Sequence, residues 1–273
     1  SKPVRPRGRA RSSNPPAPDL VADPYSALAA GYDAVMAHVD YPGWADYLED
    51  VIREHHPDAR SIVELGCGTG TLAVALQPLG PDGGYEYRGY DGAPAMVEVA
   101  RRAALEAGRS VPFETADFLE PVPGPPADVI VLVYDGLNYL LDLEDVETML
   151  GHIRDGLAPG GIAIVDQSTP ANSVNHPDSF DDIGEAGAFR YVRSSAYDAE
   201  TRLHTNTFTL TDPKTGRRTT ETHVQRAYGL EEVRGAIGRA GLHIVAAYDG
   251  FEVDAATEES ERVHWVLEVD AAR

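Results

Sequence analysis

The stretch Val63-Glu64-Leu65-Gly66-Cys67-Gly68-Thr69-Gly70 decides the fold, because it joins a strand to a helix across a glycine-rich loop. Ser61–Leu65 is predicted to be a short apolar strand, and Thr71–Leu76 the helix that follows it. Glycine at every second position permits positive φ angles and lets the backbone approach a ligand closely. The free N–H groups of the following helix can hold an anion such as a carboxylate. The stretch therefore predicts a ligand site at the end of this strand.

Strand and helix patterns alternate on the C-terminal side of this loop. Pro94–Ala107 is a predicted helix, with a proline in its first turn and a glycine after its end. A second helical stripe of apolar residues runs from Leu143 to Leu157. The predicted strands are Tyr85–Asp91, Val111–Ala116, Ala127–Tyr134 and Gly161–Val165. This succession predicts a parallel sheet with right-handed crossovers.

The pattern changes after residue 170. Ala171–Gly187 is polar and acidic, which predicts a loop. Three extended runs rich in Thr, Tyr, Val and Arg follow and predict an inserted antiparallel sheet. These runs are 189–197, 202–211 and 217–228. A helix over Leu230–Ala240 and two further strands, 242–248 and 263–269, then complete the first sheet.

The complete pattern predicts an α/β fold with a doubly wound, seven-stranded sheet and an inserted antiparallel β-sheet. We expect four parts along the chain. They are a disordered, basic and proline-rich tail (1–22), lid helices with a Rossmann-like cofactor-binding core (23–170), the inserted β lid (171–228) and the end of the core (229–273). The lid helices include one from Gly43 to His55, where the apolar residues share one helical face.

Composition limits the possible partners. The 273-residue chain carries a net charge of −21 although its first residues are basic, so the folded body repels phosphate groups. This argues against nucleic acid or an anionic membrane as a partner. No apolar run approaches the roughly 20 residues that span a bilayer. With a single cysteine, Cys67, and no secretory signal, we expect a cytoplasmic protein, either monomeric or homodimeric.

Three features of the ligand loop bear on which cofactor it binds. The loop reads GxGxG after Glu64, whereas a dinucleotide fingerprint would place a third glycine where Thr71 stands. A buried Glu64 is costly unless it is paired, and a cationic ligand group would stabilise it. Asp91, at the tip of the next strand, suits the ribose hydroxyls of either cofactor class. Asp117 and Phe118 suit an adenine amino group and ring face.

At this point the chain resembles a known family. VELGCGTG, GYDGAPAMVEVA, TADF and LAPGGIAIVD resemble the successive motifs of class I S-adenosylmethionine-dependent methyltransferases, over about residues 24–270. The resemblance implies S-adenosylmethionine as the cofactor. It places the glycine loop against the methionine part, Asp91 at the ribose and the Asp117–Phe118 pair at the adenine. The implied cofactor-binding residues are Tyr32, Glu64, Gly66, Cys67, Gly68, Gly70, Asp91, Met96, Asp117, Phe118 and Tyr134.

A narrower resemblance is to bacterial small-molecule methyltransferases. The N-terminal pattern with Tyr32, Asp33 and Met36, the run Asp135–Leu140, and the run Glu221–Tyr228 are similar to segments of that group. The resemblance implies that an N-terminal lid and the inserted sheet cover the active site. It also implies a small soluble methyl acceptor, whose identity the sequence leaves open.

Three residues are candidates for catalysis. Methyl transfer is an in-line displacement that depends on alignment, and it needs a base only when the nucleophile starts protonated. His223, which shares a strand face with Glu221, is a base or substrate contact, or else a structural histidine. Tyr32 contacts the cofactor from the lid, or packs at a helix start. Asn138 orients the substrate or caps a helix. No Cys/His spacing indicates a metal site.

The sequence therefore predicts methyl transfer from S-adenosylmethionine to a nitrogen or oxygen of a small soluble metabolite. Two alternatives stay open. One is a non-catalytic module that binds S-adenosylmethionine. The other is a nicotinamide-dependent oxidoreductase, which the GxGxG loop disfavours, as does the absence of any lysine between Lys2 and Lys214.

Overall fold

A computed structural model describes residues 19–176 and 182–269 of the chain. The main sheet has seven strands in the order β11-β12-β6-β5-β2-β3-β4. Their bounds are β2 Ser61–Leu65, β3 Glu86–Asp91, β4 Phe113–Thr115, β5 Ala127–Leu132, β6 Leu157–Ser168, β11 Leu242–Asp249 and β12 Arg262–Val269. The five neighbouring strands β6, β5, β2, β3 and β4 pair in parallel, while β12 is antiparallel to both β6 and β11. The predicted seven-stranded α/β fold is confirmed.

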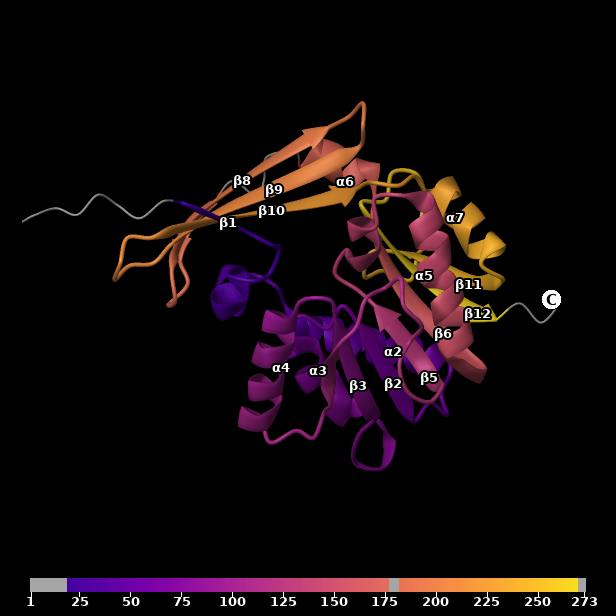
Figure 1. Cartoon of the computed structure of the whole chain (residues 1–273). Helices are drawn as coiled ribbons and strands as arrows, with labels where there is room; N and C mark the ends of the chain where they lie inside the picture. The colour runs from indigo at the N-terminus through magenta and orange to yellow at the C-terminus, as the bar shows by residue number, and fades with distance from the viewer. Residues whose placement is uncertain (1–18, 177–181, 270–273) are drawn as a thin grey trace, which may run out of the picture.

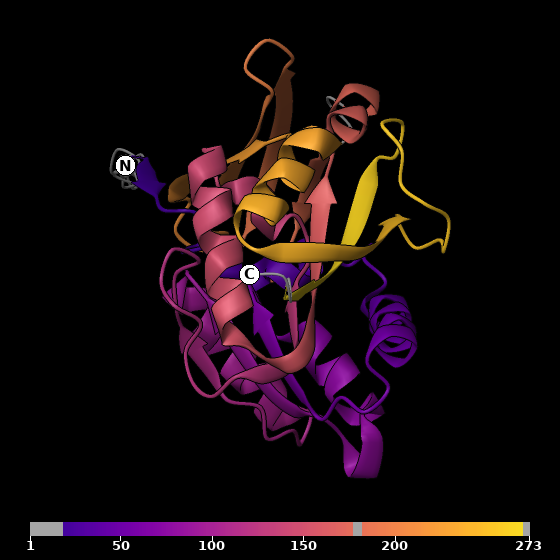
Figure 2. The ribbon, with the colours of Figure 1, turned by 90° about the vertical axis from the view of Figure 1, so that its right-hand side faces the viewer.

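Helices cover both faces of this sheet, because each strand presents apolar side chains on two sides. One face packs against α2 (Tyr41–His55), α3 (Thr71–Leu76) and α4 (Pro94–Glu106). The other face packs against α5 (Leu143–Gly156) and α7 (Leu230–Arg239), which lie side by side in Figures 1 and 2. None of the helices in the described ranges is long and apolar enough to cross a membrane.

A second sheet lies over one end of the main sheet. Its five strands have the order β1-β10-β9-β8-β7 and are antiparallel except for the β1–β10 pair. Their bounds are β1 Leu20–Ala22, β7 Asp182–Glu185, β8 Arg190–Asp198, β9 Leu203–Thr211 and β10 Arg218–Arg226. In Figure 1 the indigo N-terminal segment lies between this orange sheet and α4. The segment contains two short helices, η1 (Leu28–Gly31) and α1 (Tyr32–Val35).

Some boundaries differ from the sequence predictions. Residues 1–18 of the predicted tail lie outside the described residues, but Leu20–Ala22 pairs with β10 as a strand. Two elements occupy the predicted loop after residue 170, namely α6 (Pro170–Asn175) and β7. The predicted strand to Tyr134 ends at Leu132, because the backbone turns into the left-handed region two residues later. These differences arise from tertiary pairing, which a short polar segment does not reveal by its own pattern.

Candidate active site

A cavity of about 600 Å³ opens where β2, β3 and β5 end. This position is where open α/β sheets bind ligands, and the volume falls within the usual range for a small-molecule site. The main sheet contributes loops that follow its strands, and the N-terminal segment contributes the opposite wall. Residues on the wall include Tyr25, Tyr32, Gly66, Gly68, Asp91, Met96, Phe118, Tyr134 and Tyr139.

The glycine loop after β2 brings backbone directly to the cavity. Gly68 has a φ of 53°, and a Cβ at this position would meet no atom of the protein within 4 Å. Gly70 has a φ of 75° and begins α3, but a Cβ there would lie 2.9 Å from Cζ of Phe113. The missing side chain at Gly68 therefore leaves open space for a ligand, whereas the missing side chain at Gly70 allows the Phe113 ring to pack against the loop.

Asp91 holds the glycine loop in place. Its Oδ2 atom accepts a hydrogen bond from the Gly68 N–H at 2.8 Å, and its Oδ1 atom accepts one from the Ala93 N–H at 2.8 Å. Burial raises the pKa of Asp91, while these two backbone hydrogen bonds oppose the rise. The carboxylate is thus fixed at the mouth of the cavity, and its remaining lone pairs can accept hydroxyl groups of a ligand.

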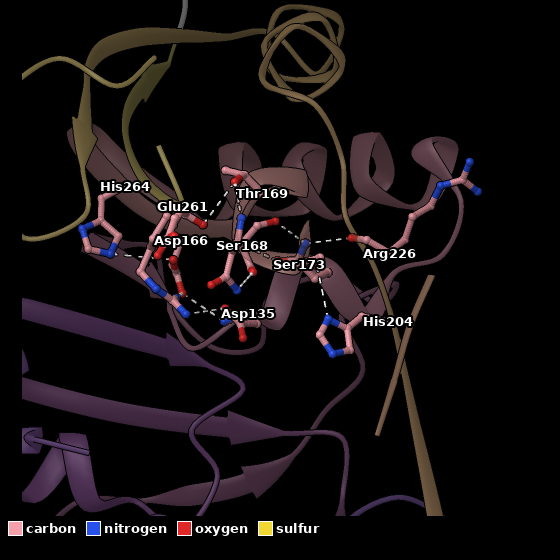
Figure 3. A network of polar contacts seen from close by, with 12 residues as sticks. Asp135, Asp166, Ser168, Thr169, Ser173, His204, Arg226, Glu261 and His264 are labelled. Atoms are coloured by element: carbon pink, nitrogen blue, oxygen red, sulfur yellow. Dashed lines mark hydrogen bonds and ion pairs between the residues drawn. The ribbon is translucent and has the colours of Figure 1, made fainter. Parts of the chain in front are cut away.

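A strained turn follows β5. Tyr134 and Asp135 have φ angles of 61° and 60°, which non-glycine residues adopt only at an energetic cost. Asp166 accepts a hydrogen bond from the Asp135 N–H at 2.9 Å, and Arg262 contacts the Asp135 carboxylate at 2.8 Å. Arg262 also pairs with Asp166. Figure 3 shows Asp135, Asp166 and His264 in this network of polar contacts. The turn places the Tyr134 ring between two cavities.

Burial keeps His264 neutral. Burial lowers its pKa to about 3, and the Arg262 guanidinium adds to the effect. Nδ1 of His264 forms a hydrogen bond with the Tyr47 hydroxyl at 2.8 Å. Within the described ranges, no group of three or more His, Cys, Asp or Glu side chains is arranged to hold a metal ion.

The N-terminal segment is held at two points. Asp33 accepts hydrogen bonds from the hydroxyls of Thr69 and Thr71 in the glycine loop, at 2.5 and 3.4 Å. Glu221 of β10 accepts hydrogen bonds from backbone N–H groups of the segment, including Tyr25 at 2.8 Å and Leu28 at 3.0 Å. The segment is thus a lid, defined here as residues 23–36, which connects the main sheet to the second sheet.

A second, smaller cavity of about 120 Å³ adjoins the first beneath the second sheet. Tyr25, Tyr32, Tyr134 and Tyr139 line both cavities. The far wall of the smaller cavity is formed by Asp135, Arg193, Asn206, Phe208, His223 and Gln225. Four tyrosines therefore surround the junction through which a group would pass from one ligand to another.

Comparison with known proteins gives the family. A family model described as a methyltransferase domain matches residues 62–161. Putative methyltransferase YqeM of Bacillus subtilis is 26% identical over 243 residues, covering 88% of this chain and 94% of that protein. A crystal structure of an S-adenosylmethionine-dependent methyltransferase from Clostridium acetobutylicum has a TM-score of 0.74 at 21% identity, covering 87% and 96% of the two chains.

The chain belongs to the class I S-adenosylmethionine-dependent methyltransferases. It is an enzyme, and S-adenosylmethionine is its methyl donor. The alternative of a nicotinamide-dependent oxidoreductase is therefore wrong. The residues present fit this donor, because the larger cavity combines exposed loop backbone at Gly68, a fixed carboxylate at Asp91 and the apolar side chains of Met96 and Phe118.

The predicted cofactor residues fall into two groups in this methyltransferase. Those on the cavity wall are Tyr32, Gly66, Gly68, Asp91, Met96, Phe118 and Tyr134. The described cavity wall does not include Glu64, Cys67, Gly70 or Asp117. Asp117 is exposed and its Oδ1 atom accepts a hydrogen bond from the Leu119 N–H at 2.8 Å, so its adenine contact stays a prediction.

Two of the predicted residues are buried, Glu64 in β2 and Cys67 in the glycine loop itself. Cys67 is buried, and burial raises the pKa of its thiol well above the ordinary range, so it is not a nucleophile at neutral pH. Glu64 is 3% exposed and accepts a hydrogen bond from the Tyr87 hydroxyl at 2.9 Å. Burial raises the pKa of Glu64 to about 8, although this hydrogen bond opposes the rise.

The side chain of Asn138 forms hydrogen bonds with backbone groups of the protein. It lies within η4 (Gly136–Tyr139), and its side-chain amide donates to the carbonyl groups of Ser168 and Arg226, each at 2.8 Å. Its Oδ1 atom accepts from the Ser168 N–H at 3.0 Å. Because backbone groups occupy both ends of the amide, Asn138 holds η4 against β6 and β10, and its contact with the substrate stays a prediction.

Sequence reasoning missed Tyr25, Tyr139 and Glu221 as site residues. Tyr139 and Glu221 stand inside segments that resemble the small-molecule methyltransferases, and alternation along a strand places Glu221 on the same face as His223. That face points toward the smaller cavity, where His223 is 2% exposed. Tyr25 follows a proline in a short polar stretch and carries no comparable signal.

The two glycines predict different main effects of the same substitution. Gly68→Ala should cost about 1–2 kcal/mol of folding free energy for its left-handed backbone. It should also weaken S-adenosylhomocysteine binding by roughly tenfold or more, since a methyl group forced against a ligand costs about 1–3 kcal/mol. Gly70→Ala has the same backbone cost, and its clash with Phe113 should lower the stability by a further ~1–3 kcal/mol. Urea unfolding and calorimetric titration measure the two effects. Wild-type affinity in Gly68→Ala would contradict the assignment of this glycine to the ligand.

The pKa of Glu64 predicts a pH-dependent stability. Its folded-state pKa of about 8 lies above that of an unfolded glutamate, so the folded state binds more protons between these values. Stability of the ligand-free protein should therefore fall as pH rises from about 4.5 to 8. Glu64→Gln removes this ionisation and should be roughly 1–2 kcal/mol more stable than wild type at pH 8. Urea unfolding at pH 5 and pH 8 tests this; an equal difference at both values would show that Glu64 ionises freely.

Proposed function

We propose that this methyltransferase transfers the methyl group to an amine nitrogen of a small metabolite, with a hydroxyl oxygen as the second candidate. The observation that carries the proposal is the smaller cavity, which meets the cofactor cavity at four tyrosines. Its volume of about 120 Å³ admits the reacting part of a small molecule. Alignment of the acceptor with the methyl group is the main requirement of the reaction, and this junction supplies it.

The lining of the smaller cavity supports an amine. The faces of the tyrosine rings attract a cationic or amine-bearing group. The Asp135 carboxylate on the same wall is already paired with Arg262, so the rings supply most of this attraction. A further polar cavity of about 110 Å³ continues from it and shares Asp135, Asn206 and Gln225. This continuation supports an acceptor whose other end carries hydroxyl or amide groups, because unpaired buried polar atoms are costly.

Relatives support the same class of acceptor. The dTDP-4-amino-2,3,4,6-tetradeoxy-D-glucose N,N-dimethyltransferase of Saccharopolyspora spinosa is 25% identical over 224 residues, covering 77% of this chain and 83% of that protein. The named substrate of that relative is an amino sugar, so the likeness supports the amine, although this deoxygenated sugar ring has no hydroxyl group for the polar continuation to bind. The second candidate, a hydroxyl oxygen, is favoured by His223, since a hydroxyl acceptor must lose its proton to a base.

Matched pairs of acceptors test the proposal. Release of S-adenosylhomocysteine is measured with amino sugars and simple amines, and with analogues in which a hydroxyl replaces each amino group. We expect turnover of the amine in at least one pair, with mass spectrometry placing the added methyl group on nitrogen. Methylation of hydroxyl oxygen alone selects the second candidate. Methylation of carbon alone, or binding of the cofactor without turnover of any acceptor, overturns both.

A further inference from the structure

A chain of polar side chains leads from the junction of the two cavities into the second sheet. Tyr25 and Tyr139, which line both cavities, share a short hydrogen bond between their hydroxyl groups. The Tyr139 hydroxyl also lies 3.2 Å from Nδ1 of His223. Nε2 of His223 lies 3.4 Å from Oε2 of Glu221. The chain therefore runs from the place of methyl transfer to a carboxylate that is 0% exposed.

The geometry fixes the roles of the histidine nitrogens. Glu221 is an acceptor when ionised, so Nε2 of His223 carries the proton that faces it. Nδ1 is then free to accept a hydrogen bond from the Tyr139 hydroxyl. Burial alone would raise the pKa of Glu221, but the nearby His223 ring and hydrogen bonds from the lid backbone lower it below its ordinary value. An ionised carboxylate behind a histidine is the arrangement that stabilises an imidazolium when a proton arrives.

We infer that Tyr25, Tyr139 and His223 form a proton relay that removes the acceptor's proton, with Glu221 as the residue that positions His223. This inference rests on the proposed function. When bound, S-adenosylmethionine supplies the methyl group, whose carbon–sulfur bond breaks as the acceptor's lone pair forms the new bond, leaving S-adenosylhomocysteine. The proton of the acceptor passes to the Tyr25 hydroxyl, whose own proton moves to Tyr139. Tyr139 in turn passes a proton to Nδ1 of His223.

Several titratable and charged groups share the cavity of His223. The titratable and charged groups that share its cavity are Glu221 from its own strand, Tyr25 and Tyr32 from the lid, Tyr134, Asp135 and Tyr139 after β5, and Arg193 from β8. The relay accepts a proton only while His223 is neutral. Methyl transfer should therefore slow as the pH is lowered and His223 becomes protonated, which gives an acid limb in the pH–rate profile.

A purely structural histidine is the alternative. His223 does pack against aromatic rings, with centroids 4.5 Å from Tyr25 and 5.3 Å from Phe208. Packing alone does not require that both ring nitrogens face polar partners, as they do here. A relay and a packing role differ in the tautomer of the ring and in the response of the ring to Tyr139.

Nuclear magnetic resonance of the imidazole nitrogens tests the relay without an acceptor. The protein is labelled with nitrogen-15 in histidine and saturated with S-adenosylhomocysteine, and His223→Gln assigns the signals. We expect the Nε2–H tautomer in wild type, and a shift of the Nδ1 signal in Tyr139→Phe, which removes its hydrogen-bond donor. An Nδ1–H tautomer, or an Nδ1 signal that Tyr139→Phe leaves unchanged, overturns the relay.

Kinetics with the most active amine of the matched pairs tests the same relay in turnover. Tyr139→Phe and His223→Gln should lower kcat by roughly 100-fold and remove the acid limb. In His223→Gln, whose site lies outside the cofactor cavity wall, the affinity for S-adenosylhomocysteine should stay within about threefold. Glu221→Gln should move the acid limb, which a role in folding alone would not do. His55→Gln is the control and should keep the limb, because His55 contacts the Tyr248 hydroxyl and lines none of these cavities.

The two proposals fail in different ways. An acid limb that survives in both Tyr139→Phe and His223→Gln overturns the relay and leaves the amine acceptor standing. Wild-type turnover with no amine overturns the proposed function, and the imidazole signals then decide the relay by themselves.

Discussion

Replacing Asp91 with alanine should weaken binding of S-adenosylmethionine and S-adenosylhomocysteine by roughly 10- to 150-fold, the worth of a hydrogen bond to a charged group. The carboxylate has two functions in the structure. It faces the cofactor cavity, where the family resemblance places the ribose, and it holds the N–H groups of Gly68 and Ala93. Alanine removes both at once, so the glycine loop loses its support together with the ligand contact. Calorimetric titration of the purified protein measures the change.

Two comparisons sharpen this result. Asp91→Asn keeps an oxygen acceptor of the same size and should lose less affinity than the alanine variant. Glu114→Ala removes an exposed carboxylate on the next strand and should bind both ligands as wild type does. Equal affinity in Asp91→Ala and Glu114→Ala would mean that the ribose is held elsewhere.

Replacing Arg262 with leucine should destabilise the fold by about 2–4 kcal/mol, near the lower end for breaking a buried ion pair. Arg262 neutralises the carboxylates of Asp135 and Asp166, and Asp166 is completely buried. The side chain of Arg262 is itself 24% exposed, so water softens the loss somewhat. Without the guanidinium, the strained turn at Tyr134 also loses one of its two restraints. Urea unfolding at pH 7 measures the free energy of unfolding.

The pH dependence separates this effect from simple loss of packing. Burial raises the pKa of Asp135 while Arg262 opposes the rise, so removing Arg262 should raise that pKa further. When the folded-state pKa of a carboxyl group is raised, the free energy of unfolding falls as the pH rises from the unfolded-state pKa to the folded-state pKa. The difference between wild type and Arg262→Leu should therefore shrink as the pH is lowered toward 4. Arg60→Leu, at an exposed pair with Asp82, should cost no more than about 1 kcal/mol at any pH.

Much of the fold is predictable because its signals are local. The buried strands β2 and β5 are nearly continuous apolar runs, and α4 begins and ends with a proline and a glycine. The strand β1 escaped prediction because Leu20–Ala22 gains its partner only from β10, about 200 residues away in the sequence. The strand β7 escaped for a similar reason, since its acidic sequence carries no alternating pattern.

The same distinction explains the active site. Gly68, Asp91 and Phe118 are predictable because each stands at or just after the end of a strand, and the parallel sheet brings these ends together. Tyr25 and Glu221 are not, because their meeting depends on how the lid seats on the second sheet. For Asn138 the sequence supplied a suitable polar side chain, but its hydrogen bonds to β6 and β10 backbone arise only in the folded structure.

The contact between Glu221 and the lid has a consequence for the order in which the protein is completed. The backbone N–H of Tyr25 and the carboxylate that holds it are 196 residues apart in the chain. A ribosome releases the first of these long before it adds the second, and contacts of such long range form late. The part of the protein that is synthesised first is therefore among the last to reach its final place. A nascent chain that already holds the glycine loop still lacks the cover of its cofactor site.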